Sequence, residues 1–398
     1  MLADGKVLVA GGCPKTGVQR SRELGIPENQ LEDPASEVIC ANSQGSAEVF
    51  DPKSGKWTGV SPMSEERAQP QAVAIPPRPR SRCGRLCGFV MVIGGNISGS
   101  ENKATAEFFD PKTGKWSPAP SPDPLRFGLA LPLLGPVKVC GKLCGKIFMV
   151  GTSTVPGSPT AAAIFDPVKE KWSPIQKPPV ILGRPGYTVT VLASGEVLLL
   201  GGLAGQLLPS EEISGGRALP GGPALYYPLE GVWRVLDSGE SVGREGHSAT
   251  PLKNGKVLIA GGAQTATRTG LGSAELFALG GAGKSGSGSY RPTGPLKQPR
   301  KNHAAVVLPG DKVLVSGGTP PFNQNGSSAP RVPPEPELYD PQTARWASTT
   351  GTASYRGSFR KSGWSIFEMT LLADGRVLAT GGIAQDDRAL ESADIFGP

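Results

Sequence analysis

The stretch Asp4-Gly5-Lys6-Val7-Leu8-Val9-Ala10-Gly11-Gly12 sets a pattern that runs through the whole chain. It joins a turn signal, a short β-branched apolar run and two glycines, which predicts a buried strand ending at a bend or a close backbone approach. Variants return six times and end at Gly95, Thr152, Gly202, Gly262, Gly318 and Gly382, with Thr152 in the place of a second glycine. Copies at roughly 50 to 80 residues apart form an internal repeat.

Two further phrases recur after the copies: the first follows each copy, and the second follows most of them. The first ends in an aromatic residue and Asp-Pro, as in Ala47-Glu-Val-Phe-Asp-Pro52 and Ala106-Glu-Phe-Phe-Asp-Pro111. The second places a basic residue before tryptophan, as in Lys56-Trp57, Lys115-Trp116 and Arg345-Trp346. An alternating segment precedes every glycine strand except the first, so a full repeat predicts four short strands.

This order of phrases resembles the kelch repeat, and the resemblance covers almost the whole chain. Kelch repeats build β-propellers, in which each repeat is one four-stranded blade around a central channel. The resemblance therefore implies one all-β domain over residues 1–398, a seven-bladed kelch-type propeller. Its blades are expected at about residues 1–62, 63–122, 123–182, 183–242, 243–298, 299–355 and 356–398.

The two ends of the chain leave two blades short of a strand, if strands are named a to d from the channel outward. Only Met1 to Gly5 precede the first glycine strand, so blade 1 lacks its innermost strand a; blade 7 lacks its outermost strand d. Met1-Leu-Ala-Asp-Gly5 copies Leu371-Leu-Ala-Asp-Gly375, which ends a full strand a. We therefore expect the chain to be cut short at the front, from a longer secreted precursor.

Composition narrows the function classes. The 56 glycines and 40 prolines sit at fixed places in apolar periods, which indicates turns rather than disorder. A net charge of +7 is modest, and no basic run interleaves with aromatic residues, so we expect no nucleic-acid partner. No apolar run approaches 18 residues, so we expect no membrane span. We also expect the protein to be a monomer.

The six cysteines fall into three neighbouring pairs. Cys83-Gly-Arg-Leu-Cys87 and Cys140-Gly-Lys-Leu-Cys144 occupy the same place in two successive repeats, and Cys13 and Cys40 flank one long loop. An even count with local partners favours three disulfides and an extracellular or cell-surface location. The alternatives are free structural thiols or a metal site, although zinc needs about four ligands gathered together.

Some kelch-type propellers belong to copper oxidases resembling galactose oxidase, whose copper ligands are two histidines and two tyrosines, one tyrosine being linked to a cysteine. This chain has only two histidines, His247 and His303, at matching repeat positions. Matched positions favour a scaffold role. We therefore expect no metal, no cofactor and no catalytic residue.

An arginine stands at the start of strand a in six repeats: Arg67, Arg126, Arg184, Arg244, Arg300 and Arg360. By repeat symmetry these arginines lie on one face of the disc around the channel mouth, with Trp364 nearby. As a ligand site they would attract an anionic group, since arginine pairs bidentately with carboxylates. The alternative is that they hold the repeats together through salt bridges or carbonyl contacts between blades.

The function expected from these features is that of a non-catalytic, extracellular binding module. It would bind a protein or glycan ligand, with an anionic group favoured by the arginines, on the face that carries the d–a and b–c loops. One alternative is an enzyme on the same scaffold, of carbohydrate-oxidase or sugar-isomerising type. A further alternative is a structural spacer in a larger surface protein, because fold alone does not decide function.

Overall fold

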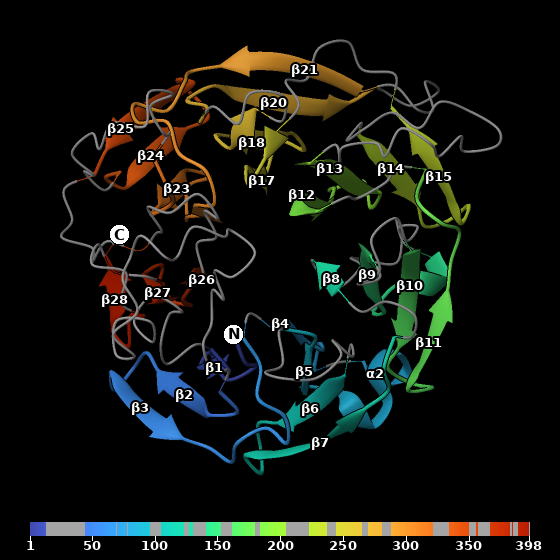
Figure 1. Ribbon diagram of the computed structural model, residues 1–398. Coiled ribbons are helices and arrows are strands. Elements are labelled where there is room, and N and C mark those ends of the chain that lie inside the picture. The colour runs from blue at the N-terminus through green and yellow to red at the C-terminus, as the bar shows by residue number, and fades with distance from the viewer. Residues whose placement is uncertain are drawn as a thin grey trace, which may run out of the picture.

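The computed structural model describes residues 1–12, 44–68, 70–77, 79–95, 105–122, 127–129, 141–152, 161–179, 184–203, 223–236, 244–264, 270–280, 288–320, 334–349, 356, 367–382, 384 and 389–397. Small antiparallel sheets are arranged in a ring around a central channel (Figure 1), which is a seven-bladed β-propeller. In each blade the strands pair in chain order.

Blades 1 to 3 form the first part of the ring in chain order. Blade 1 has β1 (Val7–Ala10), β2 (Ala47–Asp51) and β3 (Lys56–Gly59). Blade 2 has β4 (Gln71–Ala74), β5 (Val90–Ile93), β6 (Ala106–Asp110) and β7 (Lys115–Ala119). Blade 3 has β8 (Phe127–Leu129), β9 (Ile147–Thr152), β10 (Ala161–Asp166) and β11 (Lys171–Pro174).

Blades 4 to 7 complete the ring. Blade 4 has β12 (Arg184–Val191), β13 (Val197–Leu203), β14 (Ala224–Tyr227) and β15 (Val232–Val235). Blade 5 has β17 (Ser248–Pro251), β18 (Val257–Ala260), β20 (Ala274–Leu279) and β21 (Gly288–Thr293), beside the short pair β16 (Arg244–Glu245) and β19 (Ala263–Gln264). Blade 6 has β22 (Ala304–Val307), β23 (Val313–Ser316), β24 (Glu337–Asp340) and β25 (Arg345–Ser348). Blade 7 has β26 (Phe367–Leu371), β27 (Val377–Gly381) and β28 (Ala393–Phe396).

These sheets confirm the expected propeller and its seven blades. Blades 2 to 6 have four strands each, whereas blade 1 and blade 7 have three among the described residues. The strand that blade 1 lacks is the inner one, because β1 pairs with β2 alone in the described part of the chain.

The aromatic-Asp-Pro phrase forms strand c and the turn after it. Its aromatic residue lies directly opposite the tryptophan of strand d, as in the register pair Tyr339 and Trp346, whose ring centroids are 5.0 Å apart. Such cross-strand aromatic pairs stabilise antiparallel sheets. The following Asp340 then accepts a hydrogen bond from the backbone N–H of Gln342 at 2.9 Å, which shapes the turn.

The same tryptophan ties its blade to the preceding one. Trp346 Nε1 donates to the carbonyl of Gly294 at 2.7 Å, and Trp172 Nε1 donates to the carbonyl of Pro120 at 2.9 Å. The apolar core is likewise shared between neighbours: one cluster joins Ile93 and Phe108 of blade 2 to Phe165 of blade 3. The core therefore lies between blades rather than inside them.

The glycine pair explains why the blades approach so closely. Gly261 has a φ of +63°, in the left-handed region, and a Cβ there would lie 2.6 Å from the carbonyl oxygen of Arg300 in the next blade. Only glycine combines that backbone conformation with that approach.

Blade 7 meets blade 1 and closes the ring on one face. Leu372 and Leu378 pack in one buried cluster with Val7 and Phe50. Arg376 Nη2 also donates to the carbonyl of Pro52 at 2.8 Å. These contacts lie toward the hairpins that join strands a and b.

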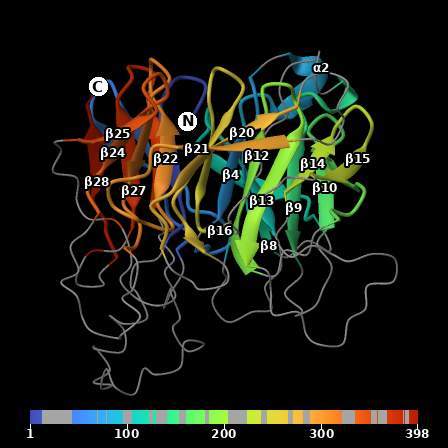
Figure 2. The same ribbon diagram turned by 90° about the horizontal axis from the view of Figure 1, so that it is seen from above.

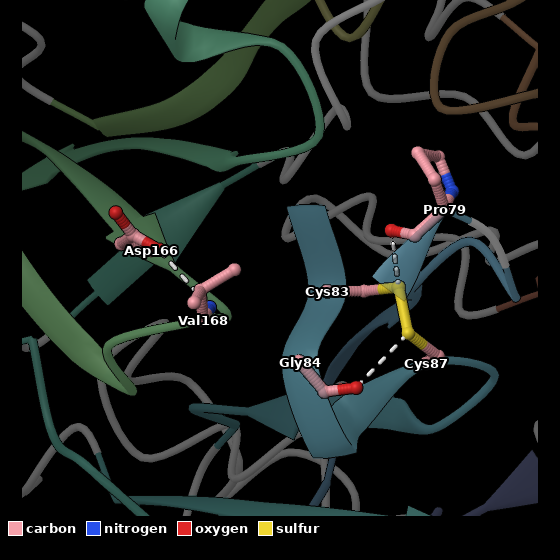
Figure 3. Close-up of a disulfide and its surroundings, with 6 residues drawn as sticks. All are labelled: Pro79, Cys83, Gly84, Cys87, Asp166 and Val168. Carbon is pink, nitrogen blue, oxygen red and sulfur yellow. Dashed lines mark hydrogen bonds between the residues drawn. A yellow bond between two sulfur atoms is a disulfide. The ribbon is translucent and has the colours of Figure 1, made fainter. Parts of the chain in front are cut away.

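The cysteine hairpin of blade 2 forms a disulfide between Cys83 and Cys87, with an S–S distance of 1.99 Å (Figure 3). In place of a simple tight turn, the segment folds into α2 (Arg80–Cys83) and η2 (Gly84–Leu86), and η3 (Gly141–Leu143) is the counterpart in blade 3. A disulfide sulfur carries no proton, so the dashed lines from these sulfurs to Pro79 and Gly84 mark sulfur–carbonyl contacts.

The remaining predicted disulfides are only partly visible. Cys144 is disulfide-bonded, while its predicted partner Cys140, and the predicted pair Cys13 and Cys40, lie outside the described residues. Within the described ranges, no helix has the length and apolar character needed to cross a bilayer.

Candidate functional site

The arginine at the start of strand a enters a buried pocket of its own blade, which we call the Arg–Glu cradle. In blade 6, Arg300 Nη1 donates to the carbonyl of Gly317 at 3.3 Å, and Nη2 donates to the carbonyl of Glu335 at 2.6 Å. The same Nη2 lies 2.6 Å from the carboxylate of Glu337. The cradle thus combines the carbonyl of the first glycine of the pair, a second carbonyl before strand c, and the acidic second residue of the strand-c phrase.

The cradle recurs in other blades. In blade 2, Arg67 Nη1 donates to the carbonyls of Gly94 and Thr105, both at 2.9 Å, and Nη2 lies 3.3 Å from Glu107. In blade 5 the equivalent groups are Arg244, the carbonyls of Gly261 and Ser273, and the carboxylate of Glu275.

The acidic residue of the cradle also accepts hydrogen bonds from the linker that leads into strand a. Glu337 accepts backbone N–H bonds from Lys297 at 2.7 Å and Gln298 at 3.1 Å. Burial lowers the pKa of Arg300, and the Glu337 carboxylate opposes that shift. A buried pair needs such additional hydrogen bonds to offset the desolvation of both charges.

The arginine backbone joins its blade to the one before. The second glycine of blade 5, Gly262, donates its N–H to the carbonyl of Arg300 at 2.8 Å, and Gly12 of blade 1 does the same to Arg67 at 2.8 Å. Arg67 and Arg300 therefore each accept a hydrogen bond from the preceding blade with the backbone carbonyl and donate to their own blade with the guanidinium.

These salt bridges and carbonyl contacts are the ones expected if the arginines hold the repeats together instead of binding a ligand. The side chains of Arg67, Arg244 and Arg300 are buried, with 0%, 2% and 0% of their surface exposed, so their guanidinium groups face the blade interior rather than the channel mouth. Ligand binding by the other predicted residues stays a prediction. Arg184 begins β12 but its side chain is not described, and Arg126, Arg360 and Trp364 lie outside the described residues.

In blade 7 the cradle is filled by Arg356, which the sequence analysis missed in favour of Arg360. Arg356 Nε lies 3.0 Å from the carboxylate of Asp394, and its Nη2 donates to the carbonyl of Ser392 at 3.0 Å. Blade 7 has a longer connection before strand a, so the arginine nearest the strand is not the equivalent one. The sequence feature that points to a cradle arginine in blade 7 is Asp394, the acidic second residue of the strand-c phrase.

The two histidines link neighbouring inner strands. His247 Nε2 lies 3.0 Å from the hydroxyl of Thr188 in blade 4, and His303 Nε2 lies 2.9 Å from the hydroxyl of Ser248 in blade 5. Desolvation by burial, reinforced by the positive charge of Arg244 for His247 and of Arg300 for His303, lowers the pKa of each to about 3. Both imidazoles are therefore neutral near neutral pH.

These histidines do not fit a copper centre of the galactose-oxidase type. Each is buried within its own inter-blade contact and already bonds a hydroxyl through Nε2, and the chain has no further histidine. Among the residues that the structure describes, no three His, Cys, Asp or Glu side chains gather to hold a metal ion.

A band of backbone hydrogen bonds forms part of the channel mouth. Gly246 donates its N–H to the carbonyl of Gly186 at 2.9 Å, and Asn302 donates to the carbonyl of Gly246 at 2.7 Å. Asn302 has a φ of +53°, a left-handed conformation that asparagine tolerates better than most residues. Blades 4, 5 and 6 are thereby locked together where their inner strands begin.

A cavity of about 250 Å³ opens beside this band. Its lining comes from four blades and comprises Gly186, Tyr187, Gly246, His247, Asn302, His303, Ala304, Ala305, Phe367, Glu368 and Met369. Solvent reaches Glu368, yet surrounding protein desolvates its carboxyl group and raises the pKa. This cavity brings a carboxyl group, an amide and aromatic side chains to one point, and we take it as the candidate ligand site.

The cavity and the cradles lie on one face of the disc. Figure 2 shows the disc edge-on, with α2 on one face and β16, at the start of the inner strand of blade 5, toward the other. The face near β16 is therefore the one onto which the d–a connections and the glycine pairs open.

No protein-family model matches the sequence, and no curated protein is significantly similar to it in sequence. A solved structure, a novel fungal alcohol oxidase with catalytic diversity among the AA5 family, in complex with copper, superposes with a TM-score of 0.61. Its sequence is 16% identical, and the match covers 98% of this chain and 71% of the oxidase. At this identity the likeness shows the fold, and this chain has the fold of a seven-bladed β-propeller.

Proposed function

We propose that the protein is a non-catalytic binding module whose ligand enters the channel mouth on the face that bears the d–a and b–c loops. The observation that carries the proposal is the cavity beside Asn302 and Glu368. Its floor and wall are held by backbone hydrogen bonds between blades, so the site is pre-formed, which lowers the entropy cost of binding.

The cavity suits one polar group of a larger ligand, such as a terminal sugar of a glycan or a side chain of a protein. Its volume of about 250 Å³ is slightly below the range of about 300–1,000 Å³ that is usual for ligand pockets, so it would hold only part of a ligand. The Glu368 carboxyl and the Asn302 amide would exchange hydrogen bonds with hydroxyl or amide groups, and Tyr187 and Phe367 supply apolar wall. The Cys83–Cys87 disulfide supports an extracellular or cell-surface location for this module.

The test is saturation-transfer NMR with a panel of neutral and acidic methyl glycosides, followed by titration of the best binder. Glu368→Gln and Asn302→Ala should each weaken that binder by roughly tenfold or more, because hydrogen bonds to charged or buried partners are lost. Glu230→Gln, in the exposed turn after β14, is the matched control and should leave binding unchanged. Equal binding by all variants would remove the channel mouth as the site.

The enzyme alternative predicts a different result. Its support is the likeness of fold to the copper alcohol oxidase. The assay is peroxide release from primary alcohols and sugars after incubation with copper, with His247→Gln and His303→Gln as variants. Copper-dependent turnover that both substitutions abolish would favour the oxidase over the binding module.

A further inference from the structure

Among the described residues, blade 1 contains every part of the Arg–Glu cradle except the arginine. The phrase Ala47-Glu48-Val49-Phe50 puts Glu48 at the position that Glu107, Glu275 and Glu337 hold in their blades. Yet Glu48 is exposed and forms no ion pair in the described part of the chain. The carbonyl of Gly11, which corresponds to that of Gly317, receives no hydrogen bond from a described residue.

A cavity of about 840 Å³ lies at this point, between blade 7 and blade 1, and we call it the 7/1 seam. Blade 1 contributes Gly11, Glu48 and Trp57, and blade 7 contributes Gly382, Glu391 and Ser392. The described lining residues include two acidic side chains and no basic one. The seam is therefore complementary to a cation.

The seam between blades 5 and 6 shows what fills the equivalent space in a complete pair. There the carbonyl of Gly294 accepts from Trp346, Leu296 is buried at 4% exposure, and Arg300 enters the cradle. The carbonyl of Arg300 accepts from Gly262, and β22 pairs with β23.

In the described part of the chain, the groups that these contacts satisfy have counterparts without a partner at the 7/1 seam. Trp57, the counterpart of Trp346, is 37% exposed, and its Nε1 makes no hydrogen bond to a described residue. The N–H of Gly382, the counterpart of Gly262, and the inner edge of β1 have no partner among the described residues either. A single extended segment carrying one arginine would satisfy all of them together.

We propose that the 7/1 seam binds an extended segment of a partner polypeptide, with an arginine guanidinium placed between the Gly11 carbonyl and the Glu48 carboxylate. The residues that follow the arginine add to β1 as an antiparallel strand, and a carbonyl that precedes it accepts from Trp57. Main-chain pairing supplies affinity in such strand addition, and the side-chain pocket supplies specificity. The site is separate from the channel-mouth cavity and stands independently of the function proposed for it.

The first experiment is isothermal titration of the full chain with a synthetic peptide that copies residues 294–307, the segment that fills the complete seam. We expect saturable binding at one peptide per protein. The same peptide with citrulline at the position of Arg300 keeps the shape and loses the charge, and it should bind roughly tenfold or more weakly. Glu48→Gln should weaken the arginine peptide by a similar factor and leave the citrulline peptide unaffected, since the two changes remove one interaction.

The matched control is Glu391→Gln, which removes a charge from the opposite wall of the same cavity. It should change the affinity by less than about threefold, because it lies outside the cradle and a remote charge is screened by salt. Absence of saturable binding, equal binding of the citrulline peptide, or equal loss in the two glutamate variants would each overturn the proposal.

Hydrogen exchange of the free protein tests whether the 7/1 seam is open to a partner or is already filled by the protein's own chain. The β1 amides that do not pair with β2 should exchange quickly when the seam is open, and they should slow when the peptide is added. If they are already as protected as the amides of β23 (Val313–Ser316), the seam is filled by this same polypeptide and the partner proposal is wrong.

Discussion

Blade 6 and blade 1 carry nearly the same strand-c phrase, but its glutamate and the tryptophan that follows are buried in blade 6 and exposed in blade 1. Glu337 of blade 6 is buried, with 1% of its side chain exposed, and is bonded to Arg300 and to two backbone N–H groups. Glu48 of blade 1 is exposed and unpaired among the described residues. Trp346 is 7% exposed, whereas Trp57 is 37% exposed.

This difference in burial follows from the segment that packs against each blade. Blade 6 receives the linker at residues 294–303 and strand β22, and blade 1 has no such strand in the described part of the chain. A repeat therefore encodes the acceptors of its cradle locally, while the donor comes from the connection that precedes the blade. The following substitutions, made in matched pairs, test this comparison.

The largest effect is expected from Arg300→Ala. It leaves the Glu337 carboxylate buried without its cation, which costs about 3–5 kcal/mol of unfolding free energy. Glu48→Ala in blade 1 should change stability by less than about 0.5 kcal/mol, as at other exposed sites. Urea unfolding followed by tryptophan fluorescence measures both, and a loss below about 1 kcal/mol for Arg300→Ala would contradict a stabilising cradle.

The second glycine of the pair gives the next contrast. A Cβ at Gly318 would lie 2.7 Å from the carbonyl oxygen of Lys301 and 2.9 Å from the Cβ of His303, whereas a Cβ at Gly12 meets no atom within 4 Å. Both positions have positive φ, so each alanine carries backbone strain of about 1 kcal/mol. Gly318→Ala should cost a further 1–3 kcal/mol or so from the clash, and equal losses in the two variants would show that strand a is not what restricts this position.

The pH dependence of stability is the third effect. Since burial lowers the pKa of His303 to about 3, the unfolded chain takes up its proton near pH 6.5 while the folded chain does not. Stability should therefore fall as the pH drops through 6.5, with a slope that approaches about 1.4 kcal/mol per pH unit for each buried histidine near pH 5.

The contribution of His303 can be isolated by His303→Gln, which cannot titrate and can still bond Ser248. Urea unfolding between pH 6.5 and 5 should show a slope of unfolding free energy against pH that is smaller than in the parent protein, by about 0.7 kcal/mol per pH unit at pH 6.5 and about 1.4 near pH 5. An unchanged slope would mean that His303 is protonated in the folded state.

The smallest effect is expected from the tryptophans. Trp346→Phe removes the hydrogen bond to the Gly294 carbonyl and should cost about 1 kcal/mol. Trp57→Phe removes no hydrogen bond to a described residue and should cost less than about 0.5 kcal/mol. If the two substitutions cost the same, Trp57 already has a partner at the 7/1 seam.

Most of the fold could be predicted because each repeat encodes its own strands. The β-branched run, the Asp-Pro turn and the aromatic pair are local signals, and they predicted seven blades with the strand numbers that the described residues show. The helical turns at Cys83 and at Gly141–Leu143 could not be predicted from the repeat, because the corresponding hairpins of blades 1 and 4 to 7 carry a tight turn on a different local sequence.

The candidate site was less predictable. The repeat marked Arg67, Arg244 and Arg300, but the direction of their side chains depends on the acid two strands away. Glu368 was missed because no local motif distinguishes it, and only the curvature of the ring brings it beside Asn302.

By itself, therefore, the sequence determined the repeat, the blade number and the described strands of each blade, because these depend on short-range periodicity and turn chemistry. The tertiary structure alone decided which charges are buried and which are open to a ligand. That distinction depends on the neighbouring blade: the glutamate at this position is buried and paired where an arginine enters from the preceding connection, and exposed in blade 1, where no described arginine does so.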